Sequence, residues 1–313
     1  MAQPSETFDT YDSIGEREDL SDVIYNISPT DTPFLSSAAK TQATAVLHEW
    51  QTDSLAAAVT NNAVIEGDEA TADAVTATTR LSNSSQILDK VVTITGTQEA
   101  VDKAGRASEI AYQIAKKAKE LKRDLESSLT SNNAEVTGSA SAARVLGGLG
   151  SWVATNDVFG SGGASGGLGN TARTNGTQRA FTEAQLKSVI KSVWNAGGNP
   201  QIIMVGPFNK QKLSGFTGNS TRFDAGADAT LYTSVDVYAS DFGQTQVIPN
   251  RFSRDRDAWV LDMDYWGVAF LRDFSMHELA KTGDTEKRQL LVECTLESRN
   301  EAASGVIADL TTS

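Results

Sequence analysis

The feature of this sequence that most restricts its fold is a long segment that cannot form a core of its own. Residues 54–84 are rich in Ala and Thr and contain no aromatic side chain. Strand-like segments with β-branched residues stand on both sides, at 43–53 and 86–95. A segment this long with so little apolar mass rarely packs inside a domain. We therefore predict a hairpin that projects from the body and contacts another subunit. The alternative is a flexible surface insertion.

Residues 97–130 carry the clearest helical pattern. Apolar side chains recur every three or four positions, at Ile110, Ile114, Ala118, Leu121, Leu125 and Leu129. Gln98 and Glu99 suit the N-terminal end. Oppositely charged residues four apart, such as Lys122 and Glu126, indicate a solvated opposite face. The pattern predicts one continuous helix about 45 Å long.

Residues 1–40 have the composition of an arm. A short amphipathic helix is predicted within 16–28, and the Ser, Pro, Thr and Asp residues at 28–33 end it. Phe34 and Leu35 follow as an isolated apolar pair. Because this arm has little core, we expect it to lie on something else.

Residues 131–178 are dense in Gly and Ser, and their only large apolar anchors are Trp152, Val153, Val158 and Phe159. The segment does not contain the phosphate-binding motif GxGxxG. Gly160 and Gly162 match its first two glycines, but Ser165 stands where the third is required. We predict a flexible surface loop.

Residues 179–283 have the pattern of a compact α/β unit. Thr182 and Gln185 form a capping-box start for a helix whose apolar face is Leu186, Val189, Ile190, Val193 and Trp194. A short strand at 202–206, a helix at 209–216 and strands within 235–272 follow, which implies a mixed sheet. A last strand at 287–299 is expected to return to the long helix and the base of the hairpin, and a small-residue tail follows it.

The charge balance restricts the class of partner. Asp and Glu total 40 against 27 Lys and Arg, so the net charge is −13. Sequence-independent DNA binding depends on cations that displace counterions, so a basic DNA-binding surface is disfavoured, although a container for DNA is allowed. We find no signal peptide, and no apolar run is long enough to cross a bilayer.

Few residues suggest chemistry. Cys294 alternates with apolar residues as a buried strand position would, and His48 and His277 each lack a second ligand at helical spacing. Asp262 and Asp264 would share one strand face and could hold a divalent cation, although a solvated face is the stronger interpretation. Ion pairs account for the nearby arginines, which are Arg251, Arg254, Arg256 and Arg272. We predict no catalytic, cofactor-binding or metal site.

Several motifs resemble one known group. They are YDSIGEREDLSDVIYNISPTDTPF, GGLGSWVATN, VIPNRF, DMDYWGVAFLRDF and HELAKTGDTEKRQLLVECTLESRNEAASG, and they run in order from Tyr11 to the C-terminal region. These motifs are similar to the major capsid proteins of tailed bacteriophages. The resemblance implies an α+β chain with the Hong Kong 97-type capsid fold.

The resemblance also implies a division of the chain. The N-arm would be 1–40, and the extended E-loop 41–96. The P-domain would be 97–178, with a spine helix at 97–130 and the Gly-rich loop. The A-domain would be 179–276, and residues 277–313 would return to the P-domain. This N-arm is too short to hold the scaffolding segment of some relatives. Lys40 and Lys90 lie near the E-loop, but no motif marks them for the cross-link that other relatives form.

The function implied is that of a structural subunit, not an enzyme. Hexamers and pentamers would assemble in the host bacterial cytoplasm into an icosahedral shell, the virion capsid. It would enclose double-stranded DNA without specific binding. Portal, scaffold and decoration proteins would be partners, and a membrane would not. The alternatives are a tail-tube or decoration subunit, which usually lacks the long helix, and a soluble α/β ligand-binding protein, which would need a convergent polar site.

Overall fold

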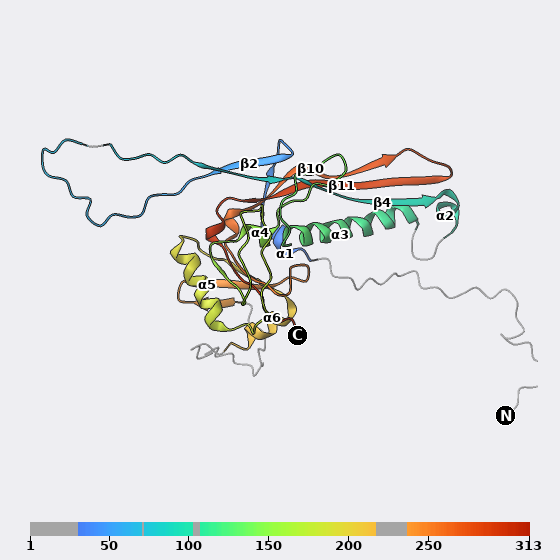
Figure 1. Ribbon diagram of the computed structural model, residues 1–313. Coiled ribbons are helices and arrows are strands. Elements are labelled where there is room, and N and C mark those ends of the chain that lie inside the picture. The colour runs from blue at the N-terminus through green and yellow to red at the C-terminus, as the bar shows by residue number, and fades with distance from the viewer. Residues whose placement is uncertain (1–30, 71, 103–106, 217–236) are drawn as a thin grey trace, which may run out of the picture.

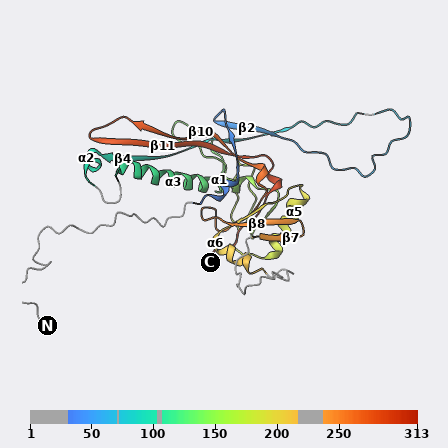
Figure 2. The same ribbon diagram turned by 180° about the vertical axis from the view of Figure 1, so that it is seen from behind.

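The computed structural model describes residues 31–70, 72–102, 107–216 and 237–313. From a central body, a long hairpin extends to one side and a slab of long strands with one helix extends to the other (Figure 1; Figure 2 shows the opposite side). The helix predicted within residues 16–28 lies outside the described residues. The structure confirms a mixture of helices and sheets, which belong to two main units.

The slab is a four-stranded sheet in the order β1-β10-β11-β4. Its strands are β1 Ala39–Gln42, β4 Gln86–Thr95, β10 Trp266–Leu279 and β11 Thr285–Ser298. Buried Val92 and Ile94 of β4 alternate with exposed Val91 and Thr93, as the period of two in a strand requires. Helix α3 packs on β4 and β11, so the predicted return of the last long strand to the helix and the hairpin base is confirmed.

The prediction of one continuous helix over residues 97–130 is wrong. A short helix, α2 (Gly96–Ala100), is followed by a break, and α3 runs only from Glu109 to Leu129. Each has its own N-cap, since Thr95 accepts a hydrogen bond from the Gln98 N–H and Ser108 accepts one from the Ala111 N–H. With 21 residues, α3 is about 32 Å long.

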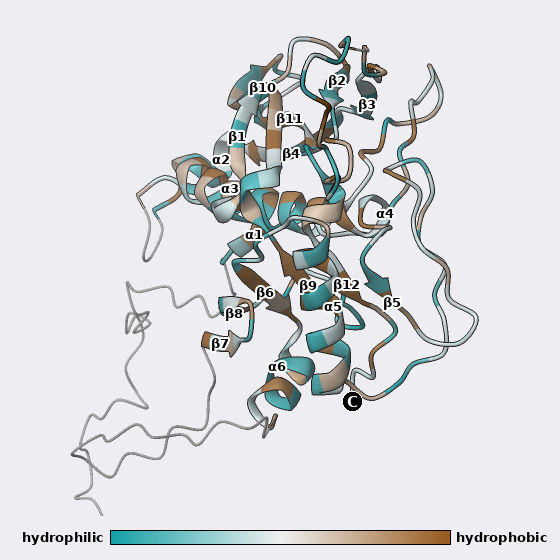
Figure 3. Ribbon diagram, turned by 90° about the vertical axis from the view of Figure 1, so that its left-hand side faces the viewer, coloured by the Kyte–Doolittle hydropathy of each residue, from teal (hydrophilic) through white to brown (hydrophobic). Residues whose placement is uncertain are grey.

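The second unit is a six-stranded mixed sheet in the order β5-β12-β9-β6-β8-β7. Its strands are β5 Asp157–Val158, β6 Ile202–Val205, β7 Val237–Ser240, β8 Gly243–Pro249, β9 Ala258–Leu261 and β12 Gly305–Ile307. Helices α5 (Glu183–Asn195) and α6 (Pro207–Ser214) belong to this unit. The capping box at Thr182 is confirmed, but Trp194 is exposed and does not join the buried face of α5. Figure 3 shows hydrophobic colours on β6, β9 and β12 at the centre.

The chain crosses between the two units twice after β9, and the sequence pattern predicts neither crossing. The sequence pattern predicts that a strand at 265–272 continues the sheet of the second unit, but β10 lies in the slab. A 3-10 turn, η1 (Met263–Tyr265), separates β9 from β10. After β11, a second turn, η2 (Glu301–Ala303), leads into β12, so the predicted tail is a strand between β5 and β9.

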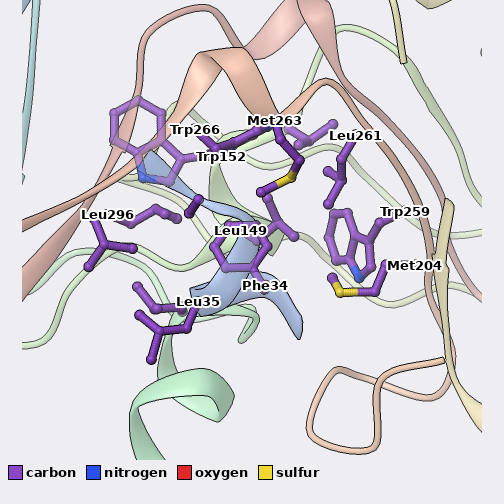
Figure 4. Close-up of a cluster of buried hydrophobic side chains, with 14 of the residues drawn as sticks. Phe34, Leu35, Leu149, Trp152, Met204, Trp259, Leu261, Met263, Trp266 and Leu296 are labelled. Carbon is purple, nitrogen blue, oxygen red and sulfur yellow. The ribbon is translucent and has the colours of Figure 1, made fainter. Parts of the chain in front are cut away.

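The Gly-rich stretch is not simply a flexible surface loop. Residues 146–153, which include helix α4 (Leu149–Trp152), are all buried. Glycine permits this packing, because a Cβ on Gly148 would lie 2.5 Å from the Ser131 hydroxyl oxygen. Leu146, Leu149 and Trp152 belong to one hydrophobic cluster that also contains residues of the slab and of the second sheet (Figure 4).

Residues 33–42 are part of the body. Phe34 and Leu35 lie on the short helix α1 (Pro33–Ser37) and are buried in that same cluster (Figure 4). The pair is isolated in sequence, but for this part of the arm the expectation that it lies on something else is confirmed. Strand β1 then pairs in parallel with β10, from Ala39 opposite Gly267 to Gln42 opposite Phe270.

Candidate assembly surfaces

The projecting hairpin has a short paired base and a long unpaired end. Strands β2 (Leu47–Thr52) and β3 (Thr79–Ser84) pair antiparallel over their full length. Beyond them the chain leaves the body without further strand or helix in the described part of 53–78 (Figure 1). A turn near the middle is closed by the Asp68 N–H, which donates to the Ile65 carbonyl oxygen at 3.0 Å. The prediction of a projecting hairpin is confirmed.

The side chains of this hairpin have two properties. Its large apolar residues are at least 72% exposed, and they are Leu55, Val59, Val64, Ile65 and Val75. In sequence, residues 53–78 also hold five carboxylates and no Lys or Arg. Soluble monomers rarely leave a group of apolar side chains uncovered, so this surface has the character of a binding surface for another chain.

The base of the hairpin is held firmly. The buried Asn83 side chain donates to the carbonyl oxygens of Gly147 (3.1 Å) and Leu296 (2.7 Å) and accepts from the Gly147 N–H (2.8 Å). The Trp50 indole N–H donates to the Ser298 carbonyl oxygen at 2.7 Å, and its ring lies against Trp152. These contacts join the hairpin to the slab and to the Gly-rich segment, so its direction is fixed at the root.

A buried carboxylate, Glu293, lies where the hairpin, the Gly-rich segment and the slab meet. It pairs with Arg144 at 2.5 Å and with Arg272 at 2.7 Å. It also accepts a hydrogen bond from the Ser85 hydroxyl at 3.0 Å. Two cations and a hydroxyl satisfy this carboxylate, which is how a buried charge is tolerated. Arg272 therefore forms a local ion pair, as expected.

A second buried carboxylate, Glu126 on α3, holds the start of the described chain. The N–H groups of Phe34 and Leu35 donate to its two oxygens at 2.8 Å each, and Asn250 donates at 2.7 Å. Burial raises the pKa of Glu126, while these three hydrogen bonds act in the opposite direction. The prediction that Glu126 and Lys122 form a solvated pair is wrong.

A set of three ion pairs joins the Gly-rich segment to the six-stranded sheet. Its ion pairs are Arg173–Asp157 at 2.8 Å, Arg254–Asp257 at 2.9 Å and Arg256–Asp309 at 2.6 Å. Burial raises the pKa of Asp257, and the neighbouring guanidinium of Arg254 opposes that rise. Arg254 and Arg256 thus form local ion pairs, as predicted.

The other residues that suggested chemistry do not converge on one site within the described ranges. Asp262 does not present a strand face to solvent; it is buried and accepts from the N–H groups of Asn199 (2.9 Å) and Asp264 (3.3 Å). The sequence FSMHELAK around His277 predicts a helical turn, but His277 lies on strand β10. His48 lies 3.6 Å from Glu297.

Cys294 is buried in the slab, which confirms that prediction, and burial raises the pKa of its thiol to about 12. Within the described ranges, no three His, Cys, Asp or Glu residues converge as a metal site would require. In the same part of the chain, no helix has the length and apolar character of a membrane span. The surfaces that stand out are therefore those suited to contact between chains.

Comparison with known proteins agrees with this reading of the surfaces. The family model described as SU10 major capsid protein matches residues 3–311. The major capsid protein of Escherichia phage Phieco32 is 30% identical, and the match covers 98% of this chain and 97% of that protein.

Solved structures show the same fold at low sequence identity. The capsid asymmetric unit of cyanophage A-1(L) has a TM-score of 0.66 and 13% identity, over 97% of this chain and 98% of that chain. The capsid of a native GTA particle has a TM-score of 0.62 and 12% identity, over 96% and 97%. The expected Hong Kong 97-type capsid fold is confirmed.

Proposed function

The chain belongs to the SU10 major capsid protein family and is a subunit of a phage capsid shell, and we propose that its hairpin joins neighbouring subunits. In this proposal residues 53–78 of one copy lie over the body of the next. The observation that carries it is the group of five large apolar side chains on the hairpin that nothing in the described part of their own chain covers. Overlap repeated around a closed ring adds many modest contacts and stabilises the shell collectively.

We assign the parts of the subunit as the family resemblance implies. The N-arm is 1–40, the E-loop 41–96, the P-domain 97–178 with its return at 277–313, and the A-domain 179–276. The paired base β2–β3 supports the E-loop assignment. The six-stranded sheet supports an A-domain with bounds other than 179–276, because β5 and β12 belong to that sheet and β10 lies in the slab. In this arrangement the long strands β10 and β11 and helix α3 provide a stiff wall element, and the hairpin provides the overlap.

The role requires no catalytic group, and we propose that the chain has none. The buried charges at Glu126, Glu293 and Asp257 all face partners within the chain, which suits a structural purpose. We further propose that copies form hexamers and pentamers in the host cytoplasm and enclose double-stranded DNA. Portal, scaffold and decoration proteins are the expected partners, since a shell must be nucleated, filled and closed.

Electron microscopy of the expressed protein tests the role of the hairpin. One variant replaces the apolar residues at the hairpin end, Val59, Val64 and Ile65, with Ser. A matched control replaces Thr60, Asn61 and Asn62 with Ser in the same segment. We expect shells or capsomer rings from the wild type and the control, and mainly free subunits from the apolar variant.

The design separates the possible failures. Shells from the apolar variant in wild-type yield would contradict the overlap by the hairpin. Tubes from the wild type would indicate a tail protein, and small globular particles would indicate a soluble α/β protein. Circular dichroism of each variant confirms that the body still folds.

A further inference from the structure

The exposed face of α3 carries a row of cations in an otherwise acidic protein. Lys116, Lys119 and Arg123 are spaced by three and four residues, so they share one face of the helix. We call these three residues the basic ridge. Among the residues that the structure describes, none of the three forms an ion pair with a carboxylate.

The carboxylates next to the ridge form ion pairs with other lysines. Lys117 pairs with Glu120 at 2.7 Å, and Lys90 of β4 pairs with Asp124 at 2.6 Å. Arg123 rests over the ring of Phe252, with 5.3 Å between the guanidinium carbon and the ring centroid, and no described carboxylate forms an ion pair with it. The ridge therefore carries positive charge that no ion pair with a described carboxylate balances, and it suits an anionic partner.

The chain itself supplies such an anion. Residues 1–30, which precede the described part of the chain, contain seven carboxylates and one cation, Arg17. Three of the carboxylates, Glu18, Asp19 and Asp22, fall within five positions. This density of negative charge complements the ridge.

The point of attachment also favours this partner. Residues 1–30 lead into α1, and the first turn of α1 is bound to Glu126, one helical turn beyond Arg123. Lys116 is ten positions before Glu126, or about 15 Å along the helix axis. Ten extended residues span up to about 33 Å, so residues 18–22 can reach every cation of the ridge. A tether this short gives a local concentration of the order of millimolar, which a free polyanion does not have.

We infer that the acidic segment of residues 1–30 binds the basic ridge on α3 of its own copy. A single exposed ion pair contributes little, but several pairs on one tether act together. The contact weakens as salt rises, because the screening length falls from about 10 Å at 0.1 M to about 3 Å at 1 M. We call this salt-sensitive contact between the acidic segment and the basic ridge the clasp.

Cross-linking between introduced cysteines tests this clasp in free subunits. Ser21→Cys places one thiol in the acidic segment, and Ala115→Cys places the other on an exposed position beside the ridge. The native Cys294 does not interfere, because it is buried and its thiol pKa is about 12. A short bismaleimide joins the pair, and a denaturing gel separates cross-links within one chain from cross-links between chains.

We expect the within-chain product to fall roughly fivefold in 1 M salt or after Lys116→Gln, Lys119→Gln and Arg123→Gln together. The same fall is expected after Glu18→Gln, Asp19→Asn and Asp22→Asn, which leave the described body untouched. The matched control neutralises three cations away from α3, by Lys187→Gln, Lys191→Gln and Lys281→Gln, and should leave the yield unchanged.

Three results would overturn the inference. They are a yield that ignores the ridge variant, a product found only between chains, and a ridge variant that loses affinity for a short DNA duplex while its cross-link persists. The last result would assign the ridge to DNA. Shell formation is scored separately by electron microscopy, so failure of the shell proposal is not confused with failure of the clasp.

Discussion

The Phe34 backbone nitrogen lies 2.8 Å from a carboxylate oxygen of Glu126, although ninety-two positions separate the two residues in sequence. This hydrogen bond, with its neighbour from Leu35, seats α1 against the last turns of α3. Asn250, which follows β8 of the second unit, donates to the same carboxylate. One side chain thus links the start of the described chain, the slab and the six-stranded sheet.

Replacing Glu126 should therefore destabilise the whole subunit. Glu126→Ala leaves two buried N–H groups and one buried amide without an acceptor, and each such group costs about 1–3 kcal/mol. We expect a loss of about 3 kcal/mol or more in the free energy of unfolding, measured by urea denaturation of free subunits. Glu120→Ala, on the exposed side of the same helix, should change it by less than about 1 kcal/mol. Equal effects of the two changes would contradict the role assigned to Glu126.

Replacing Asn83 at the base of the hairpin should also destabilise the subunit. Asn83→Ala removes three hydrogen bonds and leaves the Gly147 N–H without its acceptor, although the Gly147 carbonyl oxygen still accepts from the Trp152 indole N–H at 3.2 Å. We expect a loss of about 2–4 kcal/mol in the free energy of unfolding. Asn61→Ala, on the exposed part of the hairpin, should stay within about 0.5 kcal/mol of the wild type. A tolerated Asn83→Ala would show that the hairpin base is held by other contacts.

Proteolysis should distinguish free from assembled subunits. A protease specific for Glu can cut after Glu66 and Glu69, both exposed near the hairpin end. We expect rapid cutting there in free subunits and protection in shells, because a neighbour would cover the segment. Mass spectrometry of the fragments gives both rates, and urea-unfolded protein from either source serves as the control. Equal rates in the two native states would count against overlap by the hairpin.

The thiol of Cys294 should be inert until the slab opens. Burial raises its pKa to about 12 from an ordinary value of 9.0. Because the folded pKa is the higher one, the associated stability is present below pH 9.0 and is lost as the pH rises towards about 12. A thiol reagent at pH 8 should therefore label the native subunit only at the rate of unfolding. Labelling as fast as in denatured protein would contradict the burial of this residue.

The sequence predicted best the elements that carry their own local signals. Strand β4 runs from Gln86 to Thr95 as expected, because β-branched residues mark it and Gly96 follows. Helix α5 begins after Thr182 because the capping box is complete within four residues. The exposed hairpin was also predictable, since a segment without bulk cannot bury itself.

The sequence-based predictions were wrong where residues far apart in the sequence determine strand pairing or burial. Trp266–Phe270 is an apolar run that would suit either sheet, and only pairing with β1 and β11 places it in the slab. Glu126 has the helical position of an ordinary surface charge, and nothing near it in sequence shows that Phe34, Leu35 and Asn250 converge on it. The glycines at 147–150 mark close packing against residues 131–132 and 169, which composition alone presents as a loop.

The position of β12 has a consequence for synthesis of the protein. Residues 305–307 fill the gap between β5 and β9, so the second sheet stays open until residue 307 has left the ribosome. A product that stops before Gly305 lacks an interior strand and exposes Val260 and Trp259, which are otherwise fully covered. We expect such truncated products to misfold, and a misfolded copy would not fit among the intact subunits of a shell.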